Sequence, residues 1–127
     1  MKSVIFASLA LMVSTAAMSE EVMDDGSIVV LPVEAQQCDL PSAPAPIPEA
    51  PEKEDLLKAQ KAVKGFQADM QAYRDCINQY NDSPDVSKGN TQAILNAHNY
   101  SVSMEERVAN MFNEAVRAYK ARVAEGS

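Results

Sequence analysis

The clearest pattern along the chain is a set of apolar side chains at alternating steps of three and four residues. Its members are Leu56, Ala59, Val63, Phe66, Met70, Tyr73, Ile77 and Tyr80. This spacing places them on one side of an α-helix, and its seven-residue repeat is typical of a coiled-coil seam. Pro51 precedes the pattern, where the start of a helix tolerates proline. The pattern therefore predicts a long helix over about 52–80.

A second helical pattern follows a stretch rich in turn residues. Residues 81–85 and 88–90 contain Asn, Asp, Ser, Pro and Gly, which predicts a loop. The next helix is expected over about 91–124, and it carries two apolar stripes. The first stripe is interrupted by His98 and Glu105 and comprises Leu95, Val102, Ala109, Phe112, Val116, Tyr119 and Val123. The second comprises Ile94, Ala97, Met104, Val108, Met111, Ala115 and Ala118.

Two long helices joined by a short loop pack antiparallel, so residues 52–127 are expected to form an all-α helical hairpin. Charge supports this arrangement, because acidic residues open the first helix and basic residues close the second. These residues are Glu52, Glu54 and Asp55, and Arg117, Lys120 and Arg122. The second helix presents a wider apolar face than one partner helix covers. Either the N-terminal arm or a second copy of the chain, completing a bundle, is expected to cover the remainder.

The segment before the hairpin, residues 20–51, has a different composition. It contains six of the seven prolines, which disfavours helix and favours polyproline II. Residues 20–55 carry ten acidic side chains and one basic side chain, whereas residues 56–127 carry eight and nine. Residues 20–26 are expected to be disordered. The apolar run 28–33 is expected to be an edge strand or a docking segment, since Pro32 excludes a central strand.

The two cysteines suggest how this arm is held. An exported chain with an even cysteine count usually forms disulfides, and one intrachain pairing exists, Cys38 with Cys76. Thirteen residues of polyproline II from Cys38 to Pro51 span about 40 Å, and the helix back to Cys76 spans about 36 Å. An arm folded back along the first helix would therefore bring the sulfurs level. Two free thiols and an intermolecular bridge are the alternatives.

Such an arm has a recognisable inner face. With three residues per turn, Cys38, Pro41, Pro44 and Ile47 share one face of a polyproline helix. Small residues along one flank of the first helix leave room for it. These residues are Ala62, Gly65, Ala72 and Cys76. Gly65 costs roughly 1 kcal/mol inside a helix, and a packed arm would explain it.

Residues 1–19 have the layout of a secretory signal peptide. Lys2 precedes an apolar run from Val4 to Val13, and small residues follow at an expected cleavage site near Ala17–Ser19. The apolar run is shorter than the roughly 20 residues of a membrane span, so no stable span is expected after cleavage. The expected location is periplasmic or secreted.

Composition narrows the function classes. The net charge of −7 argues against nucleic-acid binding. No catalytic, cofactor-binding or metal-binding residues are assigned. His98, the single histidine, is interpreted as structural, and Glu105 and Glu106 as part of a solvated face, since adjacent helical residues diverge.

The chain resembles small exported proteobacterial helical proteins of unassigned function. The shared features are a signal peptide, Cys38 followed by the proline-rich stretch 41–51, and the segments 59–66, 73–76, 99–102, 112–113 and 118–122. The resemblance implies a periplasmic helical protein and assigns no catalytic residues.

The sequence therefore favours a non-catalytic interaction or accessory protein of the cell envelope, binding an envelope protein or a second copy of itself. The alternative is a small periplasmic chaperone or enzyme inhibitor. The expected interaction surface comprises Ile28, Val30, Leu31, Val102, Val108, Met111 and Phe112.

Overall fold

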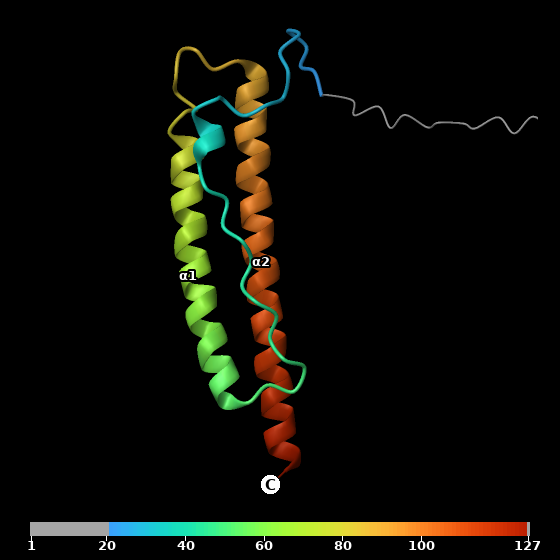
Figure 1. The fold of residues 1–127 in the computed structure, drawn as a ribbon. Helices are drawn as coiled ribbons and strands as arrows, with labels where there is room; N and C mark the ends of the chain where they lie inside the picture. Colours follow the sequence, from blue (N-terminus) through green and yellow to red (C-terminus); the bar gives the residue numbers. More distant parts are fainter. Residues whose placement is uncertain (1–20, 127) are drawn as a thin grey trace, which may run out of the picture.

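The computed structural model of this chain describes residues 21–126, so the expected signal peptide lies outside the described residues. Two long helices, α1 (Lys53–Asn78) and α2 (Lys88–Glu125), pack against each other as an antiparallel hairpin (Figure 1). The arm contributes one short 3-10 helix, η1 (Ala35–Gln37). Within residues 21–126 no strand forms, and the apolar run 28–33 contributes only an isolated bridge between Ile28 and Val22. The all-α hairpin is confirmed.

Capping residues set both helix starts. At α1, the backbone N–H of Glu52 donates to Asp55 Oδ2 at 2.8 Å, completing a capping box. At α2, Ser87 Oγ accepts from the backbone N–H of Asn90 at 3.0 Å, and Asn90 Oδ1 accepts from Ser87 at 3.1 Å. The predicted start at 91 is therefore wrong by three residues. Residues 88–90, predicted to be loop, form the first turn of α2, because Ser87 accepts from the free N–H of Asn90 and Ser27 of the arm accepts from that of Gly89.

The core confirms the apolar pattern of α1. Its buried members are Val63, Phe66, Met70, Tyr73 and Ile77. On α2 the second of the two predicted stripes meets them, since Ile94 and Val108 are buried and Ser101 occupies the position midway between them. The first stripe lies beside this seam, and Leu95 and Val102 remain 50% and 37% exposed.

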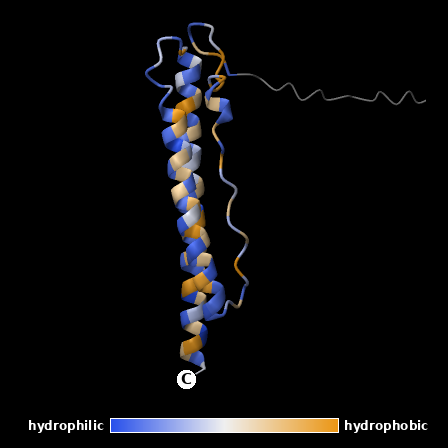
Figure 2. Cartoon of the chain, turned by 60° about the vertical axis from the view of Figure 1, so that its left-hand side comes forward, coloured by the Kyte–Doolittle hydropathy of each residue, from blue (hydrophilic) through white to orange (hydrophobic). Residues whose placement is uncertain are grey.

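The arm runs along one face of the hairpin, from the α1–α2 loop to the start of α1 (Figures 1 and 2). Its expected inner face is confirmed, because Cys38, Pro41, Pro44 and Ile47 are half-buried and the residues between them are exposed. Ile47 borders a cavity of about 40 Å³ that α1 and α2 both line. The lining includes Ala59, Val63, Val108 and Met111. The arm therefore lies along α1 as predicted and also covers the groove between the helices. Of the two expected occupants of the remaining apolar face of α2, the arm or a second copy of the chain, the structure shows the arm.

The loop end of the arm is fixed by hydrogen bonds to the start of α2. The backbone N–H of Gly89 donates to Ser27 Oγ at 2.9 Å, and Asn90 Nδ2 donates to the carbonyl of Val30 at 2.7 Å. Residues 21–26, predicted to be disordered, form a turn in which the N–H of Met23 donates to the Ser27 carbonyl at 2.8 Å. Gly26 provides the positive φ of 85° that this turn requires.

The opposite end of the arm is fixed by Arg122. Its guanidinium donates to the carbonyl of Ala50 at 3.1 Å and to that of Pro51, and it lies 3.5 Å from the carboxylate of Glu52. Pro51 is completely buried. The expected proximity of the acidic start of α1 and the basic end of α2 is confirmed for this pair.

Gly65 and Gly89 have opposite surroundings. A Cβ on Gly65 would meet nothing within 4 Å, so the expectation that the arm packs against Gly65 is wrong. The arm borders the other members of this flank, Ala62, Ala72 and Cys76, but it does not reach Gly65. A Cβ on Gly89 would overlap the backbone carbonyl of Ile28. Gly89 is therefore a position where the backbone of the arm lies directly against the backbone of α2.

These two glycines give a matched pair of variants. Gly65→Ala should raise the free energy of unfolding by about 0.5–1 kcal/mol, because alanine is the better helix former. Gly89→Ala should lower it and should speed amide hydrogen exchange at residues 27–30, because the arm must move away. Urea unfolding and hydrogen exchange measure both effects. Equal effects of the two substitutions would contradict this packing of the arm.

Candidate functional site

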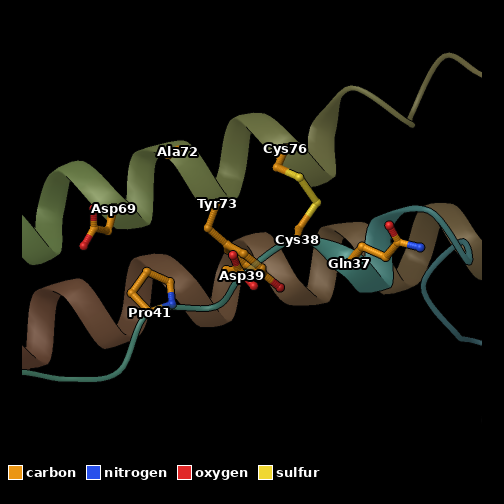
Figure 3. A pocket seen from close by; sticks show the side chains of 8 residues that line it. All are labelled: Gln37, Cys38, Asp39, Pro41, Asp69, Ala72, Tyr73 and Cys76. Carbon is orange, nitrogen blue, oxygen red and sulfur yellow. A yellow bond between two sulfur atoms is a disulfide. The ribbon is translucent and has the colours of Figure 1, made fainter.

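A disulfide joins Cys38 of the arm to Cys76 of α1 (Figure 3). The two Cα atoms are 5.9 Å apart, within the usual range for this bond. Neither cysteine is free, so the structure favours the intrachain pairing over the two alternatives. The bond closes a loop that contains the whole proline-rich stretch and most of α1, and it fixes the middle of the arm between its two hydrogen-bonded ends.

A surface pocket of about 500 Å³ lies beside this disulfide (Figure 3). Its walls include the carboxylates of Asp39 and Asp69 and the ring of Tyr73. Burial raises the pKa of the Tyr73 phenol, so this side chain is neutral and suited to hydrogen bonding at physiological pH. Because both sulfurs are bonded to each other, the pocket presents no thiolate nucleophile.

A polar cluster interrupts the apolar seam between the helices. Arg74 of α1 is buried, and its guanidinium donates to Glu105 Oε2 at 2.7 Å and to Ser101 Oγ at 3.3 Å. Ser101 in turn donates to the carbonyl of His98 at 2.7 Å. The interpretation of Glu105 as part of a solvated face is therefore wrong, because Arg74 draws this carboxylate into the edge of the seam.

The interhelical pairing of Arg74 with Glu105 and Ser101 is absent from the sequence-based predictions. Arg74 directly follows the seam residue Tyr73, at a heptad position where interhelical ion pairs commonly form. Ser101 gave a second signal, because it fills the one gap in the second stripe of α2. A small residue there leaves room for the arginine.

The single histidine also bridges the helices. His98 Nδ1 lies 3.2 Å from Nδ2 of Asn78, and the ring is half-buried. This position agrees with the structural interpretation of His98. Across residues 21–126, no three His, Cys, Asp or Glu side chains gather closely enough to hold a metal ion.

The seven residues of the expected interaction surface lie in two separate places. At the loop end, Ile28 and Val30 are exposed, whereas Leu31 packs against the core. On α2, Val102 and Met111 are exposed, Val108 is buried and Phe112 packs against the core. The residues do not form one continuous face, and three of them contribute to holding the hairpin and arm together.

A groove of about 490 Å³ lies at the loop end, between the arm and the α1–α2 loop; we call it the loop-end groove. Its apolar lining consists of Val30, Leu31, Pro32, Val33, Tyr80 and Val86. Val33 is 72% exposed, the most exposed large apolar side chain of the described residues. The charged side chains that line the groove, Glu34 and Asp85, are both acidic.

Neither helix of the described part of the chain contains a stretch both long and apolar enough to cross a bilayer. The seam residues are apolar, but charged residues on α1, and Asn, Gln, Ser and His as well as charged residues on α2, keep every stretch too polar.

Removal of the disulfide should destabilise the fold strongly. For a loop of 38 residues, the loop-entropy relation gives a contribution of about 4 kcal/mol. We expect the double variant Cys38→Ala/Cys76→Ala to lower the urea midpoint accordingly. A reducing agent should lower the midpoint of the unaltered chain by the same amount and should leave that of the variant unchanged. An unchanged midpoint after reduction would show that the arm is held without the bond.

The Arg74–Glu105 pair should show strong coupling. Arg74→Met should lower the free energy of unfolding by about 2 kcal/mol, because it leaves the half-buried Glu105 and the fully buried Ser101 without their donor. In the double variant Arg74→Met/Glu105→Leu most of this loss should be recovered, since no charge is left unpaired. A double-mutant cycle by urea unfolding measures this; additive effects would exclude an energetically coupled pair.

Comparison of the chain with protein-family models, curated proteins and solved structures gives no match. The arguments for its function therefore come from its own residues.

Proposed function

We propose that this chain is an exported, non-catalytic interaction protein of the cell envelope, and that it docks a partner protein at the loop-end groove. The observation that carries the proposal is the apolar surface left uncovered there. Val33 is 72% exposed and Val30 is 47% exposed on an arm that is otherwise anchored to the hairpin. Contiguous exposed apolar surface in a small protein commonly marks an interaction site.

The rigidity of the groove supports this role. One wall is the arm, anchored through Val30 to Asn90 and, further along, through Cys38 to Cys76. The other wall is the α1–α2 loop, whose Val86 adjoins the cap of α2 at Ser87. A surface that is ordered before binding loses less conformational entropy on docking than a flexible segment does.

The disulfide supports export, because such bonds form and persist in oxidising compartments. The layout of residues 1–19 points the same way. Under this proposal the mature chain begins near residue 20, about ten residues before Val30, the first arm residue that lines the groove.

Site-specific photocrosslinking in cells tests the proposal. A photoreactive phenylalanine analogue at Val33 should give a discrete adduct with a partner in the envelope fraction, and the same analogue at the exposed Glu114 of α2 should not. The adduct should weaken when Val30→Asp is introduced, because the charge disrupts an apolar contact. Identical adducts from both positions, or a reduced and uncleaved chain in the cytosolic fraction, would overturn the proposal.

A further inference from the structure

The charge of this molecule is distributed unevenly along its length. Residues 21–41 and 66–109 make up the half nearer the α1–α2 loop and contain eleven acidic and three basic side chains. Residues 42–65 and 110–126 make up the other half and contain six acidic and seven basic side chains. The fold creates this difference, because the acidic beginning of the arm lies beside the loop that carries Asp82 and Asp85.

The basic side chains of the acidic half do little to neutralise the negative charge at the groove. Arg74 is buried in its pair with Glu105, on the interhelical seam. Lys88 is near Asp25, whose pKa is lowered by hydrogen bonds from Ser27 and, to a smaller extent, by this lysine. None of the three basic side chains, Arg74, Lys88 and Arg107, lines the loop-end groove, where the charges of Glu34 and Asp85 face an approaching partner.

We propose that the loop-end groove binds a peptide segment of a partner protein that combines aliphatic with positively charged side chains. The inference rests on the proposed function and specifies the chemistry of its partner. Aliphatic side chains would pack against Val30, Val33 and Val86, and lysine or arginine would pair with Glu34 and Asp85. The net negative charge of this half would also speed the approach of a cationic segment and repel an acidic one.

The apolar contact and the charge pairing at the groove come from different residues, so each can be changed without the other. Glu34 and Asp85 are exposed, and the cap position at Glu34 makes no side-chain hydrogen bond to η1. Their neutralisation therefore removes charge without removing a contact that holds the fold. Val33 contributes apolar surface and is exposed, so its replacement also leaves the core intact.

Binding of designed peptides to the full disulfide-bonded chain tests the inference. Fluorescence anisotropy would compare the affinities of three labelled peptides. The first alternates leucine with lysine, the second leucine with glutamate, and the third serine with lysine. We expect measurable binding of the leucine–lysine peptide alone, weakening as salt rises. Glu34→Gln and Asp85→Asn should each weaken it by about 2- to 5-fold, the range for an exposed ion pair. Val33→Ser should weaken it by a similar factor.

Asp69→Asn is the matched control, since it removes one acidic charge beside the disulfide pocket and away from the groove. It should leave the affinity within the error of the measurement. Equal weakening by Asp69→Asn would show non-specific attraction and would overturn the inference, as would binding of the leucine–glutamate peptide or of none of the three. Sedimentation that shows self-association sensitive to Glu34→Gln, without peptide binding, would instead assign the groove to a second copy.

The two proposals fail separately. If the Val33 adduct forms in cells but the leucine–lysine peptide does not bind, the interaction function stands and the cationic partner is wrong. If neither the adduct nor the binding is seen, both are wrong.

Discussion

The packing of the arm over the groove between α1 and α2 governs both the stability of the hairpin and the surface that it presents. A hairpin of two helices has a single seam, and a core of this size rarely stabilises a chain alone. The arm adds a third layer through Pro44 and Ile47, which meet residues of both helices around one small cavity. Its three attachments differ in kind: hydrogen bonds to the start of α2, the disulfide to α1, and the guanidinium of Arg122 at the far end.

This packing also determines the surface that the molecule presents. Because the arm runs the length of the hairpin, its acidic beginning lies beside the acidic loop, and its proline-rich end lies beside the basic residues of both helices. The arm additionally contributes one wall of the loop-end groove. The same contacts that stabilise the hairpin therefore produce its polarised charge and its exposed aliphatic side chains. The proposed function and the proposed partner chemistry both follow from the path of one extended segment.

Much of this architecture was predictable because its signals are local and periodic. The seven-residue repeat identified α1 and its buried side chains, and the three-residue repeat of the arm identified the face that turns inward. On α2 two apolar stripes compete, and periodicity does not show which one meets α1. Ser101 decides between them by leaving room for Arg74, a contact between residues 27 positions apart.

The features that escaped prediction depend on which segments meet in space. Gly65 and Gly89 are both glycines in helices, but only Gly89 lies under the arm, because the arm crosses the start of α2 and does not reach Gly65. The loop-end groove unites residues of the arm with Val86, which belongs to neither apolar repeat. The early start of α2 did carry a local signal, Ser87 three residues before Asn90, but the intervening Gly89 favoured a loop.

The neighbours of Ile47 show whether the arm covers the groove between the helices. Methyl-to-methyl nuclear Overhauser effects in the oxidised protein should connect Ile47 with Val63 of α1 and with Val108 of α2, since all three border the same cavity. Observation of both connections would place the arm over the groove between the helices. Connections to α1 alone, or to neither helix, would contradict this arrangement.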